Sequence, residues 1–324
     1  MRIDKNTTIR LGGRNIVKIK LGDVVIWQKT TEPVVGPDYF YIESLGDANT
    51  VSVKNEGNGN TDNVTPTLEY STDKNIWNTI TFDWTSGTHT TELPVKLNTG
   101  EKMYFRNDTR KFSNDYNKYI TFSSTVSSNV GGDIRTLSNY LDVNNEIKPQ
   151  SKMFYGLFYN NKYIVDASNL RLSYTTLADY CYVRMFQGCT SLTSAPALPV
   201  TTLASGCYQY MFSGCNSLTT APALPATTLA SGCYGIMFSG CTSLTSAPEL
   251  PATTLESWCY YYMFSGCTSL NNVTVYADDI SATDCINNWL SGVASTGTFH
   301  NLGSATYTTD STSGIPTGWT EVKN

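Results

Sequence analysis

Nine cysteines have the most regular spacing in the sequence. They stand at positions 181, 189, 207, 215, 233, 241, 259, 267 and 285, with steps that alternate between 8 and 18 residues. Regularly spaced thiols suggest zinc ligands or disulfides, but there is no Cys-x-x-Cys pair, and both histidines, His89 and His300, lie outside this array. We therefore expect reduced cysteines that pack as small apolar side chains, and neither a metal nor another cofactor. Disulfides between stacked cysteines stay open as the alternative.

Serine and glutamate side chains in the same region are candidates for hydrolytic chemistry. Ser213, Ser239 and Ser265 recur in the phrase FSGC, but the sequence places no histidine beside them to act as a general base. Glu249 and Glu256 are isolated charges, whereas a glycosidase needs two carboxylates that face one sugar across a cleft. We expect structural serines and solvated glutamates, so that the protein is not an enzyme.

Three aspartates, Asp278, Asp279 and Asp284, follow the last strand that the sequence predicts in this region. Together with backbone carbonyls they could bind Ca2+, but their spacing matches no known calcium loop. We expect ordinary turn and capping roles for them.

Composition excludes several classes of function. The chain has 324 residues, enough for two or three domains, and 15% of them are charged. Its net charge of -5 and the lack of a basic stripe argue against nucleic-acid binding. No apolar run approaches the ~20 residues of a membrane helix, and the N-terminal MRIDKNTTIRLGG lacks the apolar core of a signal peptide. We expect a protein that is made in a cytoplasm without an export signal and does not insert into membranes.

The cysteine spacing belongs to a repeat with a period of 26 residues. Units such as ASGCYQYMFSGCNSLTTAPALPATTL recur between residues 157 and 293, with degenerate units at both ends. Such a period predicts stacked units, each of which buries its apolar side only against its neighbours. In the unit quoted, Cys207, Met211 and Cys215 lie four residues apart, which predicts one short helix or turn that ends near Gly214.

The remainder of each unit predicts a short extended segment. Leu218 and Leu224 are expected to point inward from it, and proline recurs in three of the units and shortens the strand. The proline-free segment at 270–277 should form the best strand. The last unit carries Trp289 in place of Met263, a change that we expect to close the stack.

The pattern MFSGCTSL, a short Leu/Pro segment and TTL before the next Cys-Tyr-x-x-Met-Phe resembles the leucine-rich repeats of the BspA-like surface-antigen family of gut Bacteroidetes and their phages. The resemblance covers residues 157–293 and implies an α/β leucine-rich-repeat solenoid. Members of that family are mostly adhesins or cell-surface proteins, so the resemblance also implies binding rather than catalysis.

The rest of the chain predicts further β-rich modules, so the expected fold is mainly β and multi-domain. Residues 1–31 contain TIRLGGRNIVKI and KIKLGDVVIW, which predict an N-terminal β-hairpin module that resembles those at the start of many phage tail or fibre proteins. A linker at 32–38 precedes seven short strands at 39–141, which predict an antiparallel, immunoglobulin-like β-sandwich. We assign 142–156 as a connector and 294–324 as a C-terminal cap.

Two positions of each repeat change from unit to unit, and they supply the candidate binding residues. The changing pairs are Val183-Arg184, Gln209-Tyr210, Gly235-Ile236 and Tyr261-Tyr262. Since the core does not dictate these positions, we expect them to face outward. The candidates for a platform that binds a sugar or a protein are Arg184, Tyr210, Trp258, Tyr261 and Tyr262. Packing along the convex side of the stack is the alternative for them.

Functions from different classes fit this sequence. The first is a bacteriophage virion protein of a tail or head fibre, assembled in the host cytoplasm. Its N-terminal module would contact other virion proteins, and its repeats would contact a glycan or protein of the host surface. A fibre would suit a homo-oligomer, most often a trimer, although no heptad repeat supplies a coiled-coil stalk. The alternatives are a bacterial cell-surface adhesin or glycan-binding protein, and a purely structural decoration of a capsid or tail.

Overall fold

The computed structural model of the chain describes residues 37–56, 67–82, 87–108, 118–139, 148–310 and 312–323, and the strand backbones at 9–11, 14–16, 18–21 and 24–28. Sixteen strands and one short helix occur in this part, so the protein is mainly β, as predicted. No helix among these residues has the length and apolarity needed to cross a bilayer. Most of the predicted linker at 32–38, and part of the predicted connector at 142–156, lie outside the described residues. The chain forms two compact units, Met1–Asp38 and Tyr39–Asn324.

The unit Met1–Asp38 contains four short strands in two antiparallel pairs. β1 (Ile9–Leu11) pairs with β2 (Arg14–Ile16), and β3 (Lys18–Leu21) pairs with β4 (Val24–Gln28). Each pair comes from one of the two similar Leu-Gly phrases, so the hairpins lie where the sequence predicts them.

Two sheets begin the second unit. The larger has the strand order β13-β12-β5-β10-β7-β8 and the smaller has the order β11-β6-β9. Their inner faces pack together, with Phe40 and Phe105 of the larger sheet against Phe122 of the smaller one. The strands are β5 (Phe40–Ser44), β6 (Asn49–Glu56), β7 (Thr67–Ser71), β8 (Asn78–Thr81), β9 (His89–Leu97), β10 (Lys102–Arg106), β11 (Tyr119–Ser124), β12 (Ser128–Asp133) and β13 (Ile164–Arg171).

The seven strands predicted between residues 39 and 141 correspond to β5 to β11, and every pairing among β5 to β12 is antiparallel. The sequence does not predict β12, because SNVGGD contains two glycines and no apolar alternation. Both glycines have a packing reason: a Cβ at Gly131 would collide with the ring of Tyr41, and one at Gly132 would collide with the backbone of Tyr39. The immunoglobulin-like topology stays a prediction.

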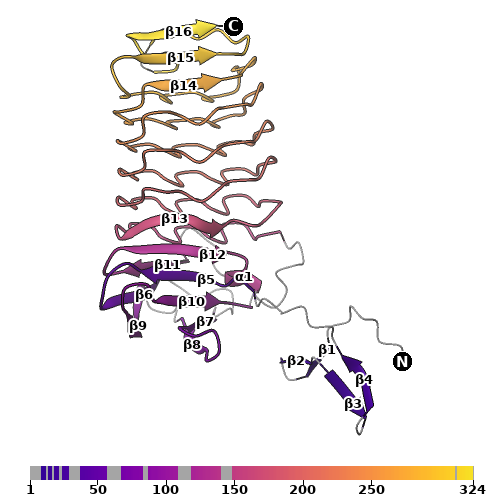
Figure 1. Cartoon of the computed structure of the whole chain (residues 1–324). Coiled ribbons are helices and arrows are strands. Elements are labelled where there is room, and N and C mark those ends of the chain that lie inside the picture. Colours follow the sequence, from indigo (N-terminus) through magenta and orange to yellow (C-terminus); the bar gives the residue numbers. More distant parts are fainter. Residues whose placement is uncertain are drawn as a thin grey trace. The chain divides into compact units, whose positions relative to one another are not determined.

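β12 joins the sandwich to the repeats. It pairs on one side with β5 and on the other, in parallel, with β13, so the larger sheet continues into the first repeat. The coils that follow lie one above another, and parallel bridges link successive repeats (Figure 1). The strands β14 (Asn272–Val275), β15 (Gly297–Asn301) and β16 (Trp319–Lys323) extend the stack in parallel. The residues assigned as a cap, 294–324, thus contribute two further strands to the same stack.

Of the two possibilities predicted for this part of each repeat, a short helix or a turn, the turn forms, and the described residues of the repeats contain no α-helix. Successive turns make up segments here called the turn segments: 152–161, 180–189, 206–215, 232–241, 258–267 and 284–292. Their N–H groups alternate between two kinds of acceptor. Arg184 N–H donates to Gln209 O of the following coil at 3.0 Å, whereas Met185 N–H donates to Tyr182 O of its own segment at 3.3 Å. An α-helix would instead bond its N–H groups within its own segment.

A left-handed residue at every fourth position explains why the turn segments are not helical. Tyr180, Arg184 and Gly188 have φ values of 59, 57 and 76°, and equivalent residues of the other coils are also left-handed. A right-handed helix cannot contain such residues. The four-residue spacing that suggests a helix is therefore the period of these turns.

Aromatic side chains form two columns inside the stack. The phenylalanine column has ring centroids 5.0 to 5.6 Å apart and consists of Phe158, Phe186, Phe212, Phe238 and Phe264. The second column runs from Phe154 through four buried tyrosines to Trp289. Leu218 and Leu224 are buried as predicted. Each ring inside a column is covered by rings of the coils on either side, so no repeat completes its core alone.

All nine cysteines are free and buried, as predicted. In one of their two columns each thiol donates to a carbonyl of an earlier coil; Cys215 Sγ lies 3.1 Å from Phe186 O, and Cys241 Sγ lies 3.1 Å from Phe212 O. Burial raises the pKa of every one of these thiols, and for Cys181 it raises the pKa to about 12. The cysteines thus act as small apolar residues, and those of this column also bond to a backbone carbonyl.

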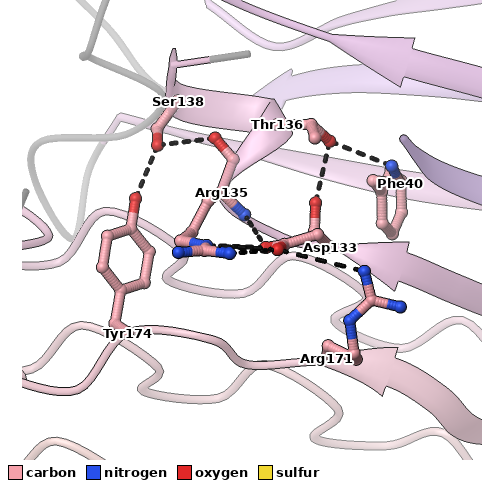
Figure 2. Close-up of polar contacts among 7 residues, drawn as sticks. All are labelled: Phe40, Asp133, Arg135, Thr136, Ser138, Arg171 and Tyr174. Carbon is pink, nitrogen blue, oxygen red and sulfur yellow. Dashed lines mark hydrogen bonds and ion pairs between the residues drawn. The ribbon is translucent and has the colours of Figure 1, made fainter. Parts of the chain in front are cut away.

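A polar cluster fixes the first repeat to the sandwich (Figure 2). Asp133 at the end of β12 is buried and accepts hydrogen bonds from the Arg135 guanidinium at 2.6 and 3.1 Å. Arg171 of β13 lies 4.0 Å from the same carboxylate. Ser138, in the helix α1 (Thr136–Asn139), shares a 2.6 Å hydrogen bond with Tyr174, whose pKa burial raises to about 12. These contacts tie α1 and β12 to the segment around β13.

Phe40 connects this junction to the apolar core. Its N–H donates to the Thr136 hydroxyl at 2.9 Å. Its ring centroid lies 6.0 Å from that of Phe158, the first member of the phenylalanine column. The sandwich and the stack therefore share one hydrophobic core.

We predict that the nine thiols react only slowly with a soluble thiol reagent in the folded protein at about pH 8. The thiolate is the reactive form of cysteine. Because burial raises the thiol pKa, the buried cysteines stay protonated at this pH. Titration with Ellman's reagent, before and after unfolding in guanidinium without reductant, measures this. We expect all nine thiols to be released on unfolding. A smaller number would show disulfides and contradict the reduced state.

Candidate functional site

Side chains of the turn segments alternate in pairs between the core and the surface. In one repeat Tyr208 is buried, Gln209 and Tyr210 are partly exposed, and the next two residues are buried again. The changing pairs thus lie on the outer side, apart from Val183 and Gly235, which are buried. The outward residues of the six turn segments are here called the turn face.

Arg184 lies between two tyrosine rings on the turn face. Its guanidinium carbon is 5.0 Å from the ring centroid of Tyr210 and 5.9 Å from that of Tyr155. Both are cation–π distances. Burial raises the pKa of Tyr155, and the charge of Arg184 opposes that shift. Two of the predicted binding residues, Arg184 and Tyr210, are therefore in contact.

The other three predicted binding residues, Trp258, Tyr261 and Tyr262, belong to the turn segment two coils after that of Tyr210. The rings of Tyr261 and Tyr262 have centroids 4.5 Å apart and planes at 63°. Trp258 is 46% exposed, and its Nε1–H donates to Asp284 Oδ2 at 3.2 Å. Desolvation raises the pKa of Tyr261, and the nearby Tyr262, Asp284 and Tyr210 raise it further. Arg184, Tyr210 and Tyr262 occupy equivalent positions of their coils, and Trp258 and Tyr261 belong to the same turn segment as Tyr262, so all five predicted residues lie along one face.

Equivalent positions of successive coils build this face. Each N–H of one column donates to the following coil, and φ in this column runs from 50 to 59°; its members are Arg184, Tyr210, Ile236, Tyr262 and Asn288. A left-handed conformation costs a non-glycine residue roughly 1–2 kcal/mol. The hydrogen bonds between coils offset this cost and hold the side chains in register.

Tyr155 is a buried neighbour of Arg184 that the repeat pattern does not identify. It belongs to the degenerate first repeat, where two inserted residues break the 26-residue register. The sequence does contain a signal for it. Phe158 aligns with Phe186 across 28 residues, and the same offset aligns Tyr155 with Val183.

Ser239, Asp278 and Asp279 have structural roles. Ser239 Oγ donates to Ser265 O of the next coil at 3.1 Å. Asp278 accepts two hydrogen bonds from Ser304, Asp279 accepts one from a following N–H, and these bonds lower the pKa of both carboxyls. The turn role predicted for Asp279 is thus confirmed, whereas Asp278 bonds to the following coil. Among the described residues, no three His, Cys, Asp or Glu side chains lie together as a metal-binding group.

A pocket of about 530 Å³ lies on the proline-containing segments of two neighbouring coils. Its lining consists mainly of alanine, proline and leucine side chains, and Glu249 is the charged member. Glu256 does not line it and instead precedes the next turn segment. The two glutamates therefore do not face one another across this pocket.

No family model, no curated protein and no solved structure matches the chain. The similarity to BspA-like repeats accordingly remains a resemblance between motifs. The arrangement of side chains on the turn face is the main basis for assigning a function.

We predict that Trp258→Ala and Tyr261→Ala each change the free energy of unfolding by no more than about 0.5 kcal/mol, because both side chains point outward. Tyr260→Ala is the matched control. It should cost about 3–5 kcal/mol, because Tyr260 is buried between the rings of Tyr234 and Trp289. Guanidinium unfolding followed by circular dichroism measures all three values. Similar losses in the three variants would contradict the inward and outward pairing.

Proposed function

We propose that the protein is a non-enzymatic component of a bacteriophage particle, in a tail fibre, head fibre or decoration, and that it binds a host surface through the turn face. The observation that carries this proposal is one set of side chains on one face: Arg184, Tyr210, Trp258, Tyr261 and Tyr262. Tyrosine, tryptophan and arginine supply most of the binding energy in protein interfaces. A preformed surface also loses less conformational entropy on binding.

The backbone at these residues supports binding rather than packing. Trp258 and Tyr262 are left-handed, with φ of 56 and 50°. Other coils have glycine at the same places: Gly206 and Gly232 correspond to Trp258, and Gly156 corresponds to Tyr262. Glycine adopts this conformation without steric cost, so the fold does not require large aromatic side chains there.

We also propose that residues 157–293 form a leucine-rich-repeat solenoid of the BspA-like type, in which turns take the place of the helix. The 26-residue period, the parallel bridges and the buried Leu218 and Leu224 support this assignment. Pairing between coils begins at Lys152, whose N–H donates to Asp179 O at 3.1 Å, so the stack starts upstream of residue 157.

The N-terminal unit supports attachment to a particle. Met1–Asp38 is compact by itself, and its hairpins are the segments that resemble phage tail and fibre modules. In this proposal the unit contacts other virion proteins, while the second unit contacts a glycan or protein of the host. A homotrimer would present several turn faces at once and increase avidity.

Mass spectrometry of density-purified phage particles, beside the envelope and secreted fractions of the same Bacteroidetes culture, tests this assignment. We expect peptides of the chain in the particle band at a constant ratio to the other virion proteins. Enrichment on cell envelopes, without peptides in the particle band, would overturn the virion assignment. It would support the alternative of a bacterial cell-surface adhesin or glycan-binding protein.

A further inference from the structure

Arg184 is an isolated positive charge. No other lysine or arginine occurs between Arg171 and Lys323. Among the described residues, no Asp or Glu forms an ion pair with Arg184. Arg184 is only partly exposed, and its guanidinium lies near two tyrosine rings and not beside a carboxylate. Arg184 therefore has a capacity to bind an anion that the protein itself does not use.

The contacts of Arg184 leave hydrogen-bond donors available. Its guanidinium lies near the rings of Tyr155 and Tyr210, and contact with a ring face involves the flat surface of the group. The guanidinium carries five N–H donors, and its hydrogen bond to Tyr155 leaves most of them available. A guanidinium positioned in this way is suited to bind a carboxylate or sulfate group through two parallel N–H bonds.

The rest of the turn face suits a sugar. Trp258, Tyr261 and Tyr262 present rings with polar edges from one coil, and Tyr210 presents its ring two coils earlier, with Ile236 at the equivalent position between them. The rings therefore form an interrupted row and not a closed pocket. A row of this kind fits an extended oligosaccharide, whose C–H groups pack on rings and whose hydroxyls bond to phenol and indole groups. Recognition of an acidic peptide would require several lysine or arginine side chains. Arg184 is the one residue of these two types between positions 172 and 322.

We infer that the turn face binds an acidic oligosaccharide, with Arg184 paired to a carboxylate or sulfate group and the aromatic residues packed against the adjoining sugars. This inference rests on the proposed function and names the ligand class for the same face. The net charge of -5 opposes general attraction of polyanions. Recognition of an acidic sugar must therefore depend on the local site at Arg184.

Calorimetric titration of the full chain with two matched pairs of probes tests this inference. Oligogalacturonate and its methyl ester isolate the effect of a carboxylate, and sulfated dextran and dextran isolate the effect of a sulfate. We expect at least one charged probe to bind about tenfold more tightly than its neutral partner. Arg184→Gln should abolish this difference. Lys162→Gln should preserve it, although it also removes a cation that lies 5.5 Å from a tyrosine ring centroid.

Equal binding of charged and neutral probes, unchanged by Arg184→Gln, would overturn the inference and leave the proposed function intact. Failure of all four probes would also overturn it, and continued adhesion of the protein to host cells would then indicate a protein receptor. Failure to adhere to any host cell would overturn the proposed function, and the inference with it. Thermal unfolding of each variant shows whether a loss of binding reflects a loss of fold.

Discussion

The alternation of backbone hydrogen bonds in the turn segments is the constraint on which the repeats depend. Every second N–H bonds within its own segment and the others bond to the next coil, as Arg184 and Met185 illustrate. This pattern satisfies the donors of segments that are too short to be stable as isolated helices. It requires a left-handed residue at every fourth position. Within each four-residue period two side chains point inward and two point outward. The inward side chains form the aromatic columns, and the outward side chains form the turn face.

A stack built in this way needs protected ends, because a terminal coil exposes backbone groups and apolar side chains. The sandwich protects the first coil, since β12 pairs with β13 and Phe158 packs against Phe40. Near the other end, the Trp289 ring stacks between Tyr260 and Tyr307, and its Nε1–H donates to Gly314 O at 3.1 Å. The turn face lies between these two supports, which restrict its movement and favour a preformed binding surface.

Sequence reasoning succeeds where a spacing has one physical explanation. The recurrence of cysteine and phenylalanine predicts buried columns, and short β-rich segments separated by turn residues predict β5 to β11. It fails where two structures share a spacing, because a four-residue period fits both a helix and a series of turns. Only the left-handed φ of residues such as Tyr210 separates the two, and a tyrosine gives no sign of it. β12 lacks a pattern because Gly131 makes room for Tyr41, and Tyr155 is hidden by an insertion.

Adhesion of the purified protein to host cells is the most direct test of the turn face as a binding surface. Binding of labelled wild-type protein to a panel of gut Bacteroidetes strains is compared with that of the Trp258→Ala/Tyr261→Ala double variant. Ile76→Ala serves as the control, because it removes a side chain of a residue that is 71% exposed on the sandwich. We expect the double variant to bind about tenfold more weakly and the control to bind normally. Equal binding by all three proteins would contradict a binding role for the turn face.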